Sequence, residues 1–114
     1  MTYKVAAYLR LSKEEYSNEK ESNSITNQKI IIDNYLNEHK EYKLIDYYID
    51  DGYSGTNFDR PEFQRMLEDI KNKKIDVILI KDLSRLGRNY IETGNFVEVV
   101  FPAMGVSVIS VEEN

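Results

Sequence analysis

The sequence predicts an α/β fold with a mostly parallel four-stranded sheet at its core and helices flanking it. Two observations carry this prediction. Four short runs rich in Val, Ile, Leu and Tyr are typical of buried strands. Between them lie three segments whose apolar residues recur at the spacing of an amphipathic helix. Because strands and helices alternate along the chain, parallel pairing of the strands is favoured.

The predicted elements follow one another from end to end of the chain. The strands are expected at residues 4–11, 44–49, 77–80 and 106–111. Each helix is expected where apolar or amide side chains stand at i, i+3, i+4 and i+7. These positions are Gln28, Ile31, Ile32 and Tyr35, then Phe63, Met66, Leu67 and Ile70, then Val97, Val100, Phe101 and Met104.

Two prolines and one polar stretch mark the ends of these elements. Pro61 suits the first position of the second helix, where a missing N–H costs no helical hydrogen bond. Pro102 is expected to end or kink the third helix, which would leave Met104 beyond it. Residues 13–23, rich in Glu, Asn, Ser and Lys, are predicted to form a mobile loop between the first strand and the first helix.

Composition limits the classes of function. The 114 residues fit one compact domain, residues 1–114. The sequence has no long apolar run and no secretory signal, which suggests a cytoplasmic protein without a membrane partner. Without cysteine there is no disulfide or thiolate metal site. A net charge of −5 argues against a free-standing DNA binder, so a role on nucleic acid needs a local cluster of positive charge or another domain.

The end of the first strand is the first candidate site. Strand alternation places Tyr8, Arg10 and Ser12 on one face. Arg10 and Ser12 are then about 7 Å apart along the strand, so that one phosphate could touch both side chains. A solvated Arg on an exposed strand face is the alternative interpretation. A polar stripe that ends in Ser is nevertheless unusual on a strand apolar enough to be central.

A basic segment follows the third strand. Arg85 and Arg88 are three residues apart and would face the same way on a helical turn, with Lys81 close by and Gly87 allowing a tight backbone. Guanidinium groups suit phosphate because their paired donors lie in one plane and keep their charge. A charged surface loop is the alternative interpretation.

The second strand ends in two adjacent carboxylates, Asp50 and Asp51, which a strand turns to opposite faces. Asp51 could have a functional role, in which it positions an Arg or takes part in proton transfer. The alternative interpretation is an ordinary turn residue. Arg60, before Pro61, stands where a helix start favours anions, or it is a surface residue of the capping region. Gln28, on an apolar helix face, needs a hydrogen-bond partner, with backbone the expected partner and phosphate the alternative.

Metal chemistry is not indicated. One histidine and no cysteine leave only carboxylates as ligands, and the sequence lacks the usual metal and nucleotide motifs. We therefore expect no cofactor. A phosphoryl-transfer site without a metal must stabilise its transition state with arginine, and four candidates fit this role: Arg10, Arg60, Arg85 and Arg88.

Taken together, these motifs resemble those of the serine recombinases, the resolvase and invertase group. The run from Tyr8 to Ser12 resembles the family's YxRxS signature, and Gln28 stands where the family has a helix Gln. Residues 51–55, followed by Arg60 and Pro61, resemble its DGYSG and RP segment, and residues 81–89 resemble its DLSRLGRN block. The segment 101–106 resembles the one before the family's last core strand. The resemblance spans nearly the whole chain.

The resemblance implies a resolvase-like catalytic domain in which Ser12 attacks a DNA phosphodiester and forms a 5′-phosphoserine bond, followed by strand exchange and religation. Arg10, Arg85 and Arg88 would neutralise the phosphoryl oxygens, supported by Gln28, Asp51, Arg60 and Tyr8. The sequences of these motifs are most similar to those of the large serine recombinases of transposons and phages. Ser84, with the acid at Asp82, departs from the small resolvases, which have Asp directly before the first Arg.

Partners follow from the same resemblance. Family members continue into a long helix that forms dimers and tetramers, and then into DNA-binding domains. This chain is therefore expected to be the catalytic fragment of a longer bacterial or phage-encoded protein that acts on double-stranded DNA, and to be inactive in isolation. Two other functions stay open on the residues alone: a non-catalytic protein-interaction module and a phosphate-ester hydrolase.

Overall fold

A computed structural model of the chain describes residues 1–17 and 23–113. Its four strands are β1 (Tyr3–Leu11), β2 (Tyr42–Asp51), β3 (Val77–Ile80) and β4 (Ser107–Ser110). They form one sheet in the order β2-β1-β3-β4, and all three neighbouring pairs are parallel. The predicted parallel four-stranded sheet is confirmed. The first two strands are somewhat longer than predicted, and the last is shorter.

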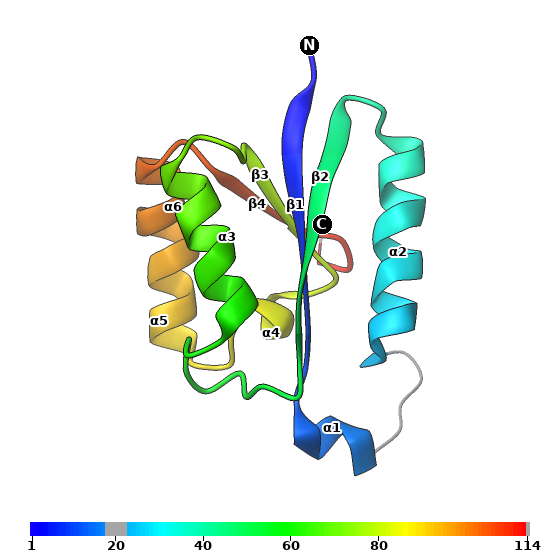
Figure 1. Ribbon diagram of the computed structural model, residues 1–114, viewed down its shortest axis with the longest axis vertical. Coiled ribbons are helices and arrows are strands. Elements are labelled where there is room, and N and C mark those ends of the chain that lie inside the picture. The colour runs from blue at the N-terminus through cyan, green and yellow to red at the C-terminus, as the bar shows by residue number, and fades with distance from the viewer. Residues whose placement is uncertain (18–22, 114) are drawn as a thin grey trace.

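The helices lie on both faces of the sheet (Figure 1). Helix α2 (Ile25–Glu38) packs against one face. On the other face lie α3 (Pro61–Lys71), α5 (Tyr90–Asn95), a π-helical turn η2 (Phe96–Val100) and α6 (Phe101–Ala103). Two short helices, α1 (Lys13–Ser17) and α4 (Leu83–Leu86), follow β1 and β3.

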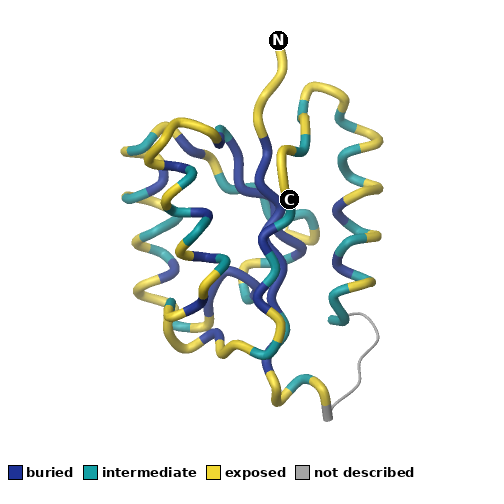
Figure 2. The backbone as a smooth tube through the Cα atoms, in the orientation of Figure 1, coloured by how far each residue is buried: buried dark blue, intermediate teal, exposed yellow. Residues whose placement is uncertain are grey.

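Strand β1 is the centre of the core because its two sets of side chains enter two different hydrophobic clusters. Val5, Ala7 and Leu9 pack with residues of α2, whereas Ala6 and Tyr8 pack with α3 and the later helices. All of these residues are at most 1% exposed. Figure 2 shows the buried strands between the two helical layers. A strand segment covered on both faces is apolar on both, which is why residues 5–9 form one continuous apolar run.

Local sequence explains where the longer helices begin. Ser24 accepts a hydrogen bond from the Asn27 N–H at the start of α2. Pro61 occupies the first turn of α3, as predicted. The predicted apolar faces of both helices are confirmed, since Ile32, Phe63 and Met66 are fully buried.

The third predicted helix is divided between Val100 and Phe101, just before Pro102. Because Pro102 has no N–H and its ring clashes with the preceding turn, a regular α-helix cannot continue through it. The chain widens into the π-helical turn just before, where the Phe101 N–H donates to the Phe96 carbonyl. The helix ends at Ala103, and Met104 lies just beyond it, as expected.

The prediction of a loop over residues 13–23 is wrong for its first part. Residues 13–17 form α1, because Ser12 followed by Glu15 is a helix-start pattern, and that pattern outweighs the polar composition. Residues 18–22 lie outside the described part of the chain.

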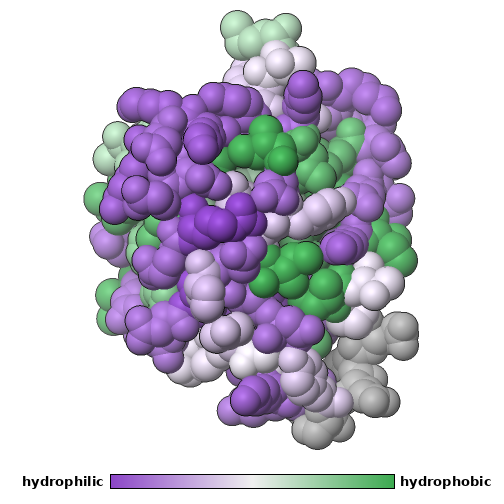
Figure 3. Space-filling model, viewed as in Figure 1, coloured by the Kyte–Doolittle hydropathy of each residue, from purple (hydrophilic) through white to green (hydrophobic). Residues whose placement is uncertain are grey.

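The surface in Figure 3 is mostly hydrophilic, with smaller apolar patches. Besides Met1, the most exposed large apolar side chains are Tyr90, Ile91 and Val99, which are on α5 and η2. None of the helices in the described ranges is long and apolar enough to cross a membrane.

Candidate active site

The polar residues singled out in the sequence gather where the carboxyl ends of parallel strands meet. Ser12 directly follows β1, and the last residues of β1 and β2, Leu11 and Asp51, are paired in the sheet. Lys81 directly follows β3, the other neighbour of β1. Binding and catalytic sites of open α/β sheets lie at this edge.

Ser12 is held by a carboxylate from the next helical turn. Its hydroxyl donates to Glu15 Oε1 at 2.9 Å, and its backbone N–H donates to the same oxygen at 3.0 Å. The serine is only 4% exposed. Its Oγ therefore has one defined direction, set by Glu15.

Arg85 and Arg88 meet on the same carboxylate. Arg85 forms a fork, with Nη1 3.2 Å from Glu15 Oε1 and Nη2 2.9 Å from Oε2. Arg88 Nη2 lies 3.8 Å from Oε1. The two arginines and Ser12 thus surround one anionic group, even though both arginines are more than 70 residues from Ser12 in sequence.

The expected reason for the pairing of Arg85 and Arg88 is wrong. Helix α4 ends at Leu86, so the two arginines do not share a helical face. Arg88 is placed instead by a backbone hydrogen bond, in which its N–H donates to the Gly55 carbonyl at 2.7 Å. The loop after β2 therefore positions the second guanidinium.

Arg10 contacts the backbone of Arg85 and is completely buried. Its Nε, Nη1 and Nη2 donate to the carbonyls of Arg85, Tyr53 and Ser84, at 3.0, 3.1 and 2.5 Å. In the part of the chain that the structure describes, each Nη makes one hydrogen bond, which leaves its second N–H without a partner there. Burial, with repulsion from Arg85 and Arg60, lowers the pKa of Arg10 to about 10, so it stays charged at neutral pH. Arg10 thus brings positive charge to the site and ties together the two loops around it.

Tyr8 and Arg60 belong to a second buried network. Arg60 donates to the Tyr8 hydroxyl at 2.9 Å and to the Leu86 carbonyl at 2.7 Å, and its guanidinium stacks over the ring of Phe58. Tyr8 in turn donates to Asp50 at 2.8 Å. Burial, ahead of its other interactions, raises the pKa of Tyr8. Arg60 is only 1% exposed, which excludes the alternative interpretation of Arg60 as a surface residue.

Asp50 and Asp51 face opposite ways, as predicted. Asp50 is buried and accepts hydrogen bonds from the N–H groups of Glu62 and Phe63, so it caps α3. Asp51 is exposed and accepts a hydrogen bond from the Tyr16 hydroxyl.

Gln28 binds backbone, the partner expected for it. Its amide nitrogen donates to the carbonyls of Arg10 and Asn23, at 3.0 and 2.8 Å. Its oxygen lies 3.4 Å from the Arg10 N–H. Gln28 therefore continues the hydrogen bonding of β1 across to α2 and fixes the backbone two residues before Ser12.

The acidic residue of the basic segment, Asp82, has cationic neighbours. It lies 3.0 Å from Lys81 Nζ and 3.6 Å from Arg85 Nε, and it accepts a hydrogen bond from Ser84. Desolvation raises the pKa of Asp82, but the hydrogen bonds from Ser84 and Lys81 outweigh it, and the pKa is lowered. Asp82 thus lies near the Nε of Arg85, whereas Glu15 contacts the two terminal nitrogens of the same guanidinium.

Sequence reasoning missed Glu15, although a signal was present. Ser12-Lys13-Glu14-Glu15 has the capping-box spacing, in which the carboxylate reaches back to the N–H of the serine. The contact between Glu15 and Arg85 spans 70 residues, and no local pattern indicates it.

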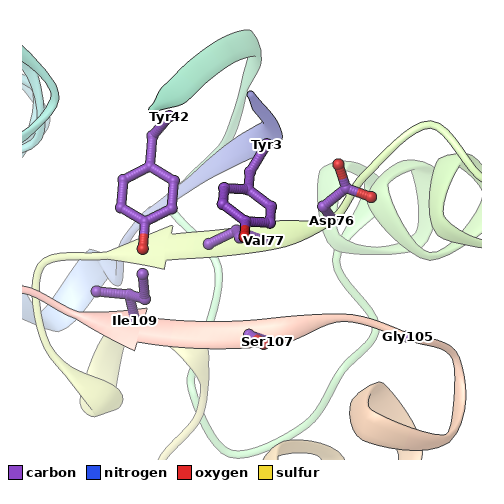
Figure 4. A pocket seen from close by; sticks show the side chains of 7 residues that line it. All are labelled: Tyr3, Tyr42, Asp76, Val77, Gly105, Ser107 and Ile109. Atoms are coloured by element: carbon purple, nitrogen blue, oxygen red, sulfur yellow. The ribbon is translucent and has the colours of Figure 1, made fainter. Parts of the chain in front are cut away.

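A metal site and a surface pocket are the other features to consider. Within residues 1–17 and 23–113, no group of three or more His, Asp or Glu side chains is arranged to hold a metal ion. An open pocket of 380 Å³ lies at the opposite, amino-terminal ends of the strands (Figure 4), lined by Tyr3, Tyr42, Asp76, Val77, Gly105, Ser107 and Ile109. Its carboxylate, Asp76, already accepts a hydrogen bond from the Lys4 N–H.

Comparison with known proteins gives consistent results. The family model described as the resolvase N-terminal domain matches residues 5–114. No curated protein matches significantly. Among solved structures, the N-terminal catalytic domain of TP901-1 integrase superposes with a TM-score of 0.83 at 34% identity, covering 96% of this chain and 78% of that one.

Two further structures are similar. A resolvase family site-specific recombinase from Streptococcus pneumoniae has a TM-score of 0.79 at 30% identity, with coverage of 98% of this chain and 74% of the other. The C-terminal catalytic domain of ISC1926 TnpA, an IS607-like serine recombinase, has a TM-score of 0.75 at 29% identity, with coverage of 95% and 67%.

Proposed function

Because this chain belongs to the resolvase N-terminal domain family and is a serine recombinase catalytic domain, we propose that Ser12 is its nucleophile. The Ser12 oxygen forms a bond to the scissile phosphorus as the bond to the 3′-oxygen breaks. The serine loses its proton, the 3′-oxygen gains one, and a 5′-phosphoserine remains. After strand exchange, a 3′-hydroxyl reverses the reaction and joins the DNA.

One observation carries this proposal. The Ser12 hydroxyl and the guanidinium groups of Arg85 and Arg88 point at a single anionic group, the Glu15 carboxylate. A phosphodiester is also an anion whose oxygens accept hydrogen bonds, and forked Arg donors match it geometrically. A phosphate bound by these two arginines would lie next to the Ser12 oxygen. Donors placed in advance around developing charge are the main source of such catalysis.

The other predicted residues support this centre in different ways. Arg10 adds a buried positive charge and, among the described residues, has one unused N–H on each Nη. Gln28 fixes the backbone of Arg10. Tyr8 and Arg60 hold the start of α3 and the end of α4 together, at a distance from the reaction. Asp51 holds Tyr16, on the helix that also carries Glu15.

We also propose that residues 1–114 are the catalytic part of a longer recombinase that assembles as dimers and tetramers on double-stranded DNA. The family acts on DNA, and the net charge of −5 favours the view that DNA affinity comes from other regions. The similar structures come from an integrase, an IS607-like serine recombinase and a resolvase family site-specific recombinase, which supports a mobile-element origin.

The test uses a full-length recombinase with this domain and a nicked suicide substrate that traps the cleaved intermediate. A covalent protein–DNA adduct should form, and mass spectrometry should locate it on Ser12. Ser12→Ala should abolish the adduct while site binding is retained, because DNA affinity comes mostly from contacts elsewhere. Ser107→Ala, an exposed serine at the other end of the sheet, is the control and should react normally.

Three arginine variants and a chelator extend the test. Arg10→Ala, Arg85→Ala and Arg88→Ala should each slow cleavage about 10²-fold or more, the usual effect of losing one donor to developing charge. Cleavage should persist in EDTA because arginines stand where a metal would act. Attachment to a tyrosine, or a strict requirement for magnesium, would contradict the mechanism. A phosphate-ester hydrolase would instead release its product to water without a stable adduct.

A further inference from the structure

Glu15 is the acidic group at the centre of an otherwise cationic site. Its carboxylate accepts hydrogen bonds from the Ser12 hydroxyl, the Ser12 N–H and both terminal nitrogens of Arg85, and Arg88 lies 3.8 Å away. The Glu15 side chain is 11% exposed and that of Arg85 is 3% exposed. Apart from the Ser12 N–H, each of these partners is a group that the proposed reaction assigns to the DNA phosphate.

Helix capping accounts for only part of this arrangement. A Glu at the third helical position commonly accepts the N–H of the capping serine, and Glu15 does so at 3.0 Å. Capping does not require a forked contact with an arginine from beyond β3. A neutral Gln at the same position would also satisfy the cap, so the charge of Glu15 needs another explanation.

The charge of Glu15 is present throughout the physiological pH range. Desolvation raises its pKa, but hydrogen bonds from Arg85 and Ser12 outweigh this and lower the pKa to about 2. Protonation therefore does not release the carboxylate from the arginines. Only a competing anion, or movement of α1, removes it.

We propose that Glu15 is an internal substitute for the DNA phosphate, occupying the donors of Ser12, Arg85 and Arg88 until substrate displaces it. This inference rests on the proposed function of the site but not on the chemistry of Ser12. In the free domain the carboxylate offsets the repulsion between the buried arginines and keeps the serine hydroxyl engaged. When a phosphate binds, two anions compete for the same N–H groups, and Glu15 must move away.

Competition of this kind lowers the apparent affinity for phosphate, because only the fraction of molecules with Glu15 displaced can bind it. Removing the charge of Glu15 should therefore strengthen anion binding. A residue needed only for structure would have the opposite effect or none. The direction of the change is what distinguishes the two roles.

The test titrates inorganic phosphate into the 114-residue chain and follows the backbone amides of Ser12 and Gly55 by NMR. Glu15→Gln retains the cap and removes the charge. It should bind phosphate at least tenfold more tightly than wild type. Glu14→Gln is the matched control, since it removes the same charge from the neighbouring position. The Glu14 side chain is 85% exposed and lies 3.9 Å from Arg88, so solvent screens this contact, and the substitution should change the affinity less than threefold.

Thermal unfolding gives a second measurement. Without phosphate, Glu15→Gln should melt at a lower temperature than wild type because the arginines lose their counter-charge, and phosphate should restore much of the loss. Wild type should respond little. If Glu15→Gln does not fold, Glu15→Asp replaces it. Its carboxylate is one methylene shorter and reaches the arginines less well, so it should also bind phosphate more tightly than wild type.

The results separate this inference from the proposed function. If Glu15→Gln binds phosphate no better than Glu14→Gln, the substitute role is wrong, whatever the suicide-substrate assay shows. If Glu15→Gln binds phosphate tightly and adding Arg85→Ala abolishes that binding, the inference stands, even if the covalent adduct were found on a residue other than Ser12.

Discussion

Gly55 shows how closely the candidate active site is packed at the residue scale. A Cβ at this position would lie 2.6 Å from Arg10 Nη2 and 2.9 Å from Arg88 Cγ. Its carbonyl meanwhile accepts the Arg88 N–H. The glycine is therefore needed for the close approach of backbone to two guanidinium side chains. The sequence indicated only that a turn occurs here.

Gly55→Ala should accordingly displace Arg10 and Arg88. We expect it to lower the free energy of unfolding by about 1–3 kcal/mol, the typical cost of overpacking, and to slow DNA cleavage by at least tenfold. Urea unfolding and the suicide-substrate assay measure the two effects.

Gly94→Ala is the control for this substitution. Gly94 is in α5, and a Cβ there would meet nothing within 4 Å. It should raise the free energy of unfolding by about 0.5–1 kcal/mol, because Ala favours a helix more than Gly does. Equal losses in the two variants would show that the packing around Gly55 is not specific.

At the scale of secondary-structure elements, Asp50 connects β2 to the start of α3. It accepts the N–H groups of Glu62 and Phe63 and the hydroxyl of Tyr8, all while only 1% exposed. Arg60, at the cap position itself, makes no side-chain capping hydrogen bond. The helix thus depends on a carboxylate from the neighbouring strand for its N-terminal hydrogen bonds.

Asp50→Ala should therefore lower the free energy of unfolding by about 2–4 kcal/mol, from the loss of the cap and of a partner for buried polar groups. Asp51→Ala changes the next residue of the same strand, where the carboxylate is exposed and contacts Tyr16. Its effect should be below about 1 kcal/mol. If urea denaturation gave similar losses for the two variants, the capping role of Asp50 would be wrong.

At the scale of the whole molecule, the candidate active site differs in charge from the rest of the chain. The chain carries −5 overall, yet it places Arg10, Arg85 and Arg88 at one edge of the sheet. Arg10 and Arg85 are buried and Arg88 is partly exposed, and over the whole chain 20 acidic residues outnumber 15 basic ones. The net charge therefore opposes the binding of long stretches of DNA. Affinity for duplex DNA rises with the number of phosphates that cations neutralise.

The isolated 114-residue chain should therefore fold but bind DNA weakly, and it should not recombine it. A gel-shift titration at physiological salt should show no site-specific complex at nanomolar protein concentrations. Nanomolar binding by this chain alone would contradict the view that other regions supply the affinity. The same titration at low salt should show more complex, because the remaining attraction is electrostatic.

The sequence alone predicted the sheet, the helices and the edge at which the site forms. Buried strands and amphipathic helices leave local periodic patterns, and parallel topology brings their carboxyl ends together. Ser12, Arg85 and Arg88 could be placed at one edge by that reasoning. Residues 13–17 were missed as a helix because their polar composition was given more weight than the spacing of Ser12 and Glu15.

Only the tertiary structure decided what each polar side chain contacts. Arg10 turned inward to three carbonyls, Arg60 became part of the core, and Glu15 met Arg85 across 70 residues of sequence. These contacts depend on how separate loops approach one another after the sheet has formed. Periodicity reports which face of an element is buried, but it carries no information about which distant donor will meet a given acceptor.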